Sequence, residues 1–70
     1  KENKMKYIIH FTTGFYFSYF CKSLRGAKLE AGRKAKIHNF TVNEENHIYI
    51  YEFDGMLPIA SKTIKGWKNH

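Results

Sequence analysis

The chain has 70 residues, of which 43% are hydrophobic and 17% aromatic, and its formal net charge is +6. This length fits one domain with a small core, because so short a chain buries only about 60% of its unfolded surface. The balance of charged and apolar residues excludes a disordered chain. The length excludes a large enzyme with a deep cleft. We expect residues 1–70 to form a single domain, with residues 1–4 flexible.

The cysteine content and the apolar stretches bear on the cellular setting. Cys21 is the only cysteine, so no intramolecular disulfide can form. A secreted domain of this size normally needs such cross-links, and a reducing, cytoplasmic setting is therefore expected. The mostly apolar stretch 7–24 has the length of a short membrane segment, but polar residues interrupt it. Its aromatic and β-branched residues suit strands better, so no membrane association is expected.

The first elements are predicted to be two strands, residues 5–12 and 15–22, joined by a turn at Thr13-Gly14 or at Gly14-Phe15. A two-residue turn pairs odd residues of the first strand with even residues of the second. One face then carries Tyr7, Ile9, Phe11, Tyr16, Ser18 and Phe20, and the other carries Ile8, His10, Thr12, Phe15, Phe17, Tyr19 and Cys21. Both faces are strongly apolar. Either the hairpin is covered on two sides, or one face is an exposed aromatic platform.

The middle of the chain differs in character from this hairpin. Residues 23–32 contain good helix formers, and Ser23 and Gly32 suit the two ends of a helix. Gly26 weakens the helix, so a short helix or an irregular loop is predicted. A third strand is predicted at residues 34–42, followed by a polar turn.

The last part of the chain is predicted to form two further strands, residues 47–53 and 56–64. The first alternates cleanly between two faces, and Asp54-Gly55 between the strands is a strong hairpin signal. Pro58 has no N–H to donate, so the last strand lies at a sheet edge or is broken there. Gly66-Trp67 is expected to close the domain.

Together these elements predict a mainly β, α+β fold. Sequential hairpins favour a five-stranded curved antiparallel sheet or a small barrel, with one short helix between strands 2 and 3. We prefer the curved sheet with the helix packed on it.

A loose resemblance accompanies this pattern. It rests on a strand ending in Phe-x-x-Gly, a helical stretch, a Tyr-rich strand and the segment Ile37-His38-Asn39-Phe40-Thr41-Val42-Asn43. Over about residues 6–52 the chain resembles small uncharacterised β-rich proteins of Gram-positive bacteria and their phages. The motifs concern turns and alternation, and the resemblance implies no activity and no site.

No catalytic residue, metal site or cofactor is predicted, and the protein is not expected to be an enzyme. His10 and Cys21 share a face of the predicted first hairpin, but no third group orients them as a base and a nucleophile. The four histidines do not cluster at metal-ligand spacing. His38 and His47 could face each other across the third and fourth strands. A non-enzymatic binding module is therefore expected.

Basic residues concentrate in the middle of the chain, where residues 22–36 carry a local net charge of +5. Proteins that bind single-stranded nucleic acid combine such cations with rings that stack on bases. We therefore predict a nucleic-acid-binding surface that consists of Lys22, Arg25, Lys28, Arg33, Lys34, Lys36, Tyr49 and Tyr51. Tyr16 and Tyr19 are further candidate rings. Alternatively, the rings belong to the core and the lysines form a solvated rim.

A protein-interaction or inhibitor module of phage or mobile-element origin is the alternative function. It would act through an apolar sheet face or an unpaired edge. Because both faces of the predicted first hairpin are apolar, a homodimer or higher oligomer is also expected at micromolar concentration. Nucleic acid binding weakens steeply with salt, whereas a hydrophobic contact does not.

Overall fold

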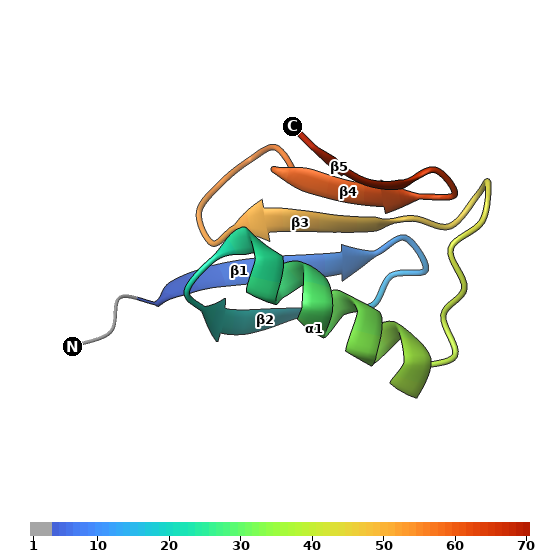
Figure 1. Ribbon diagram of the computed structural model, residues 1–70, viewed down its shortest axis with the longest axis horizontal. Coiled ribbons are helices and arrows are strands. Elements are labelled where there is room, and N and C mark those ends of the chain that lie inside the picture. The colour runs from blue at the N-terminus through green and yellow to red at the C-terminus, as the bar shows by residue number, and fades with distance from the viewer. Residues whose placement is uncertain (1–3) are drawn as a thin grey trace.

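A computed structural model describes residues 4–70 as a five-stranded antiparallel sheet with one helix on one face (Figure 1). The elements in chain order are β1 (Met5–Phe11), β2 (Tyr16–Cys21), α1 (Leu24–Ile37), β3 (Ile48–Glu52), β4 (Ala60–Thr63) and β5 (Gly66–Asn69). Along the sheet the strand order is β2-β1-β3-β4-β5. The predicted α+β class and the helix between strands 2 and 3 are confirmed, and the sheet does not close into a barrel. Residues 1–4 were predicted to be flexible, and residues 1–3 of that segment lie outside the described residues.

The first hairpin contains a three-residue loop instead of the predicted two-residue turn. The Phe11 N–H donates to the Phe15 carbonyl at 2.7 Å, and the Gly14 N–H donates to the Phe11 carbonyl at 2.9 Å. Gly14 has a φ of 104°, as expected for the glycine that follows a type I turn and forms a bulge. The loop therefore has one residue more than the predicted turn, and the pairing of the two strands shifts by one residue.

This register overturns the predicted division of faces. Odd residues pair with odd residues, as Ile9 does with Phe17, and even residues pair with even ones, as His10 does with Tyr16. The predicted face that combined odd residues of the first strand with even residues of the second is therefore wrong. His10 and Cys21, which were predicted to share a face, lie on opposite faces of the sheet.

The side of the sheet that faces α1 is the core. The largest fully buried side chains are Ile9 and Phe11 of β1 and Ile48 and Ile50 of β3. Partly buried rings and alkyl groups surround them, and Tyr7, Ala27, Ala31 and Ala60 complete the buried cluster. Alanines on the inner side of α1, Ala27 and Ala31, are fully buried and let the helix approach the sheet closely.

The helix is longer than predicted. It has 14 residues and continues through Gly32 to Ile37. The strand predicted at residues 34–42 is therefore wrong, because its first half is helical and the rest is a turn and loop. Gly26, which weakened the prediction, has a packing role. A Cβ at this position would lie 3.2 Å from the Cβ and Sγ of Cys21, so glycine permits the close approach of α1 to the end of β2.

The helix ends in a Schellman motif that the sequence reading missed. The Asn39 N–H donates to the Lys36 carbonyl at 3.3 Å, and the Phe40 N–H donates to the Ala35 carbonyl at 2.8 Å. Asn39 has a φ of 55°, the left-handed conformation that this motif requires. The ring of Phe40 then packs edge-on against Phe11, with 4.7 Å between the ring centroids. The end of the helix is thus fixed by both backbone hydrogen bonds and core packing.

The predicted turn at Asp54-Gly55 is present, but it does not form a two-residue hairpin. The Gly55 N–H donates to the Glu52 carbonyl at 2.9 Å. Pairing between β3 and β4 resumes only where Ala60 lies opposite Ile50. The chain between them forms a loop, which we call the β3–β4 loop (residues 53–59).

The C-terminal strands differ from the prediction in position. The strand predicted at residues 56–64 begins only at Ala60, so the break at Pro58 is confirmed. This strand, β4, lies between β3 and β5 and not at an edge; the edges are β2 and β5. The short strand β5 was not predicted. Gly66, with a φ of 98°, allows the tight turn that returns the chain beside β4.

Two glycine substitutions test the observed loop and helix. Gly32→Ala is expected to stabilise the protein by about 0.5–1 kcal/mol, because alanine is the better helix former and nothing lies within 4 Å of the added Cβ. Gly14→Ala is expected to destabilise it by about 1–3 kcal/mol, because alanine is strained at a positive φ. Urea unfolding measures both changes. A destabilising Gly32→Ala would place the helix end at residue 32, contrary to the structure.

Candidate nucleic-acid interface

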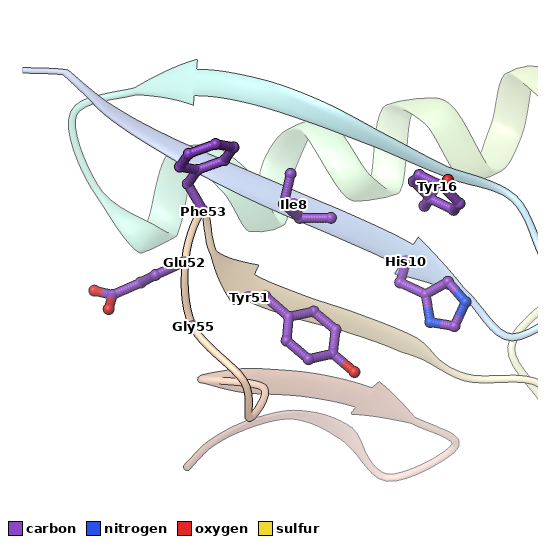
Figure 2. Close-up of a pocket in the computed structure, with 7 residues that line it drawn as sticks. All are labelled: Ile8, His10, Tyr16, Tyr51, Glu52, Phe53 and Gly55. Carbon is purple, nitrogen blue, oxygen red and sulfur yellow. The ribbon is translucent and has the colours of Figure 1, made fainter.

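The sheet face opposite α1 carries several rings and has no helix over it. Figure 2 shows Ile8 and His10 of β1, Tyr16 of β2 and Tyr51 of β3 projecting to this side, with the helix behind the sheet. Together with residues at the start of the β3–β4 loop they line a hollow of about 320 Å³. We call this surface the open face; its members are Lys6, Ile8, His10, Tyr16, Ser18, Phe20, Tyr49, Tyr51, Phe53, Ser61 and Lys68.

One row of side chains on the open face crosses all five strands. From β2 to β5 the paired residues are Tyr16, His10, Tyr49, Ser61 and Lys68. Neighbouring strands are about 4.8 Å apart, and the ring centroids of His10 and Tyr16 are 6.3 Å apart. Three rings are therefore neighbours in a row that ends at a lysine.

A second cation lies among rings where β1 begins. The Lys6 Nζ is 4.0 Å from the ring centroid of Phe53 and 5.7 Å from that of Phe20. Such cation–π contacts hold the ammonium group near the surface of the sheet. The open face therefore has one cation at each of two borders, Lys6 on β1 and Lys68 on β5.

The histidines have roles other than the predicted pairing. His38 follows the last residue of α1, and its ring centroid is 4.2 Å from that of Phe15. It does not face His47 across a pair of strands, so that prediction is wrong. His47 instead lies beside Tyr49, with 3.4 Å between its Nδ1 and the Tyr49 hydroxyl. This contact orients a ring of the open face.

The structure does not bring all predicted site residues together. Tyr49 and Tyr51 lie on the open face, as the register with His10 and Ile8 shows. Tyr19 pairs with Tyr7 and lies on the helix side. Five of the six predicted cations belong to α1, on the opposite side of the sheet (Figure 1), and the sixth, Lys22, lies between β2 and α1; the five are Arg25, Lys28, Arg33, Lys34 and Lys36.

Some of these cations make specific contacts within the domain. The Lys28 ammonium donates to Asn69 Oδ1 at 2.6 Å and lies 5.6 Å from the ring centroid of Trp67. The Lys34 ammonium lies 5.4 Å from the ring centroid of Phe17. Lys28 thus links the helix to β5, and Lys34 covers a core ring of β2. These two residues stabilise the packing of α1 in addition to adding positive charge.

Arg33 is neutralised locally by Glu30. Its Nε and one terminal nitrogen each donate to a different Glu30 carboxylate oxygen at 2.9 Å. These hydrogen bonds hold the pKa of Glu30 below its usual value and raise the pKa of Arg33. Because Glu30 itself is buried, the pair is a fixed part of the helix surface.

The Glu30–Arg33 pair makes the stability of the protein dependent on pH in acid. The folded-state pKa of Glu30 lies below the ordinary value of 4.5, so the unfolded chain binds more protons in this range. The stabilisation that the pair adds to the folded state is present above pH 4.5. It is lost as the pH falls through the lower pKa that Glu30 has in the folded state. We expect thermal melts to show a smaller loss of Tm between pH 5 and pH 2 for Glu30→Gln than for the wild type.

A control separates this pair from general acid effects. Glu44 is exposed in the loop before β3, so Glu44→Gln should keep the wild-type dependence of Tm on pH. Equal dependence in all three proteins would mean that Glu30 does not titrate differently in the folded and unfolded states.

Ser61 and His70 form a serine–histidine contact, with 2.8 Å between Ser61 Oγ and His70 Nε2. Ser61 is only 5% exposed, so the contact ties the residue after β5 to β4 and does not present a nucleophile to solvent. Among residues 4–70 no three histidine, cysteine or acidic residues cluster in a way that could hold a metal ion.

The candidate interface is assigned from geometry and chemistry. Comparisons with protein-family models, with curated proteins and with solved structures find no match to this chain. In the part of the chain that the structure describes, no helix combines the length and apolar character needed to cross a membrane.

The members of the open face that the sequence did not predict include its cations, Lys6 and Lys68, and the ring of His10. Lys6 and His10 belong there because even residues of β1 pair with even residues of β2. A three-residue loop ending in Gly14 is the signal that could have found them. Lys68 was missed because β5 itself was not predicted.

Proposed function

We propose that the protein is a non-enzymatic module that binds single-stranded nucleic acid on its open face. The observation that supports this most directly is the row of Tyr16, His10 and Tyr49 rings on an uncovered sheet in a chain of net charge +6. Rings on a sheet surface stack on unpaired bases, and each stacked base contributes about 1–3 kcal/mol. Positive charge attracts the phosphate backbone.

In this proposal, bases stack along the row while phosphates pass the cations of the open face. Tyr16 at the edge and Tyr49 near the centre give two stacking positions. Lys68 ends the row, and Lys6 lies on the same face where β1 begins. A double helix hides the faces of its bases, so the row selects single strands. The cations of α1 lie on the other side and contribute long-range attraction without contact.

Two substitutions on opposite faces test this proposal. Tyr16 and Leu29 are almost equally exposed, at 68% and 67%, but Tyr16 lies on the open face and Leu29 on α1. Tyr16→Ser is expected to weaken binding of a labelled oligothymidine by about 1–3 kcal/mol. Leu29→Ser is expected to leave binding unchanged. Fluorescence anisotropy measures both, and equal effects would contradict binding on the open face.

Salt dependence gives a second readout with a matched pair. Lys68→Gln and Lys36→Gln each remove one exposed charge, on β5 and α1 respectively. Lys68→Gln should flatten the slope of log K against log salt by about 0.7, as expected for one lost phosphate contact. Lys36→Gln should keep the slope. If the wild-type protein does not bind oligonucleotides at 50 mM salt, the nucleic acid proposal is wrong.

A protein partner is the second candidate, and the position of β2 favours it. This strand forms one edge of the sheet and exposes Tyr16 and Phe20. An extended segment of a partner could pair with its free backbone groups and continue the open face. Such binding would depend little on salt, which distinguishes it from the first candidate.

A further inference from the structure

A second hollow lies on the other side of the molecule from the open face. It has a volume of about 690 Å³ and lies between α1, the loop that follows the helix, and the first residue of β3. Its apolar lining includes Leu29, Phe40 and Val42. We call it the α1 groove.

All charged side chains that line the α1 groove are positive. They are Arg33 and Lys36 of α1 and Lys62 of β4. Glu30 offsets Arg33 but is not itself part of the lining. An occupant of this groove therefore needs apolar side chains for the lining and negative charge for the rim.

The β3–β4 loop has this combination. Phe53, Met56 and Leu57 are 59%, 93% and 79% exposed, so three large apolar side chains within five residues are mostly exposed. Glu52 and Asp54, beside them in the chain, are exposed acids. Monomeric domains seldom expose so many large apolar groups together without a binding role.

The loop cannot fill the groove of its own chain. Ile48, at the start of β3, lines the groove, whereas Glu52, at the end of β3, leads into the loop. A five-residue strand separates the two by roughly 13 Å. Figure 1 shows the β3–β4 connection at the end of the sheet away from the C-terminal end of α1. An occupant with the chemistry of this loop must therefore come from another molecule.

We propose that the protein self-associates by placing the β3–β4 loop of one copy in the α1 groove of a second copy. Met56 and Leu57 are buried against Leu29 and Phe40, and the acids beside them approach the cations of the rim. Asp54 is the acidic residue within the loop, and Glu52 directly precedes the loop. This contact joins two different surfaces, so each copy offers one loop and one groove.

A contact between two different surfaces can add further copies, because each bound copy still offers a loop or a groove. An interface between two different surfaces produces a closed ring when the rotation closes and an open chain when it does not. Met56 and Leu57 are not members of the open face, and Phe53 is the one loop residue that is. The row of Tyr16, His10 and Tyr49 therefore stays uncovered in the self-associated state, and nucleic acid binding does not require the loop contact.

Analytical ultracentrifugation without nucleic acid tests this proposal. The wild-type protein is expected to show a mass that rises with concentration through the micromolar range. Leu57→Glu in the loop and the double variant Leu29→Glu, Lys36→Glu in the groove should each remain monomeric. All three positions are exposed, so the variants are expected to fold, and far-UV circular dichroism checks this.

A mixture of the two variants gives the decisive result. Leu57→Glu keeps an intact groove, and the groove variant keeps an intact loop, so the equimolar mixture should form a 1:1 complex and nothing larger. Tyr16→Ser, on the open face, should self-associate like the wild type. The proposal is overturned if the wild-type protein is monomeric at all concentrations, if the mixture stays monomeric, or if Tyr16→Ser abolishes association.

Discussion

One 14-residue helix packs against a five-stranded sheet, so only one face of the sheet can be buried. The central strands β1 and β3 supply that face with Ile9, Phe11, Ile48 and Ile50. Full burial of each such side chain contributes about 1.5–3 kcal/mol. The remaining side chains of the same strands must lie on the other side. An aromatic surface without a cover is therefore a direct result of having a single helix.

The length of the first hairpin loop decides which rings lie on that surface. With the three-residue loop, Phe15 and Phe17 join Phe11 on the helix side, and Tyr16 and Phe20 are exposed on the other. A loop shorter by one residue would exchange these sets, because the side-chain period of a strand is two.

The sequence predicted the fold class and the first three observed strands better than it predicted the later elements. Aromatic and β-branched residues beside a glycine turn identified β1 and β2, and clean alternation identified β3. The end of α1 was misplaced because Gly32 is a common terminator, whereas the actual cap uses Asn39 in the same left-handed conformation. β5 has only four residues, of which only Trp67 is a large apolar one, too short a pattern to identify a strand.

The sequence predicted the tyrosines of the candidate site but not its cations. Tyr49 and Tyr51 were placed by the clean alternation of β3, and both lie on the open face. The cations of residues 22–36 were grouped with them because they cluster in the sequence. Closeness in the sequence does not determine which side of a sheet a helix covers. α1 contains five of the six cations and lies on the side of the sheet opposite the open face (Figure 1).

The strand order also determines how the chain can fold. β1 with β2, and β4 with β5, are hairpins closed by short loops, whereas the pairing of Phe11 with Ile48 joins distant parts of the chain. The entropy cost of loop closure rises with loop length, so closing the hairpins and the helix costs less entropy than joining the sheet at its centre. Until β3 docks, the inner edge of β1 has unpaired backbone groups beside Ile9 and Phe11. That edge is the segment through which two incompletely folded chains would pair, so refolding should be most efficient in dilute solution.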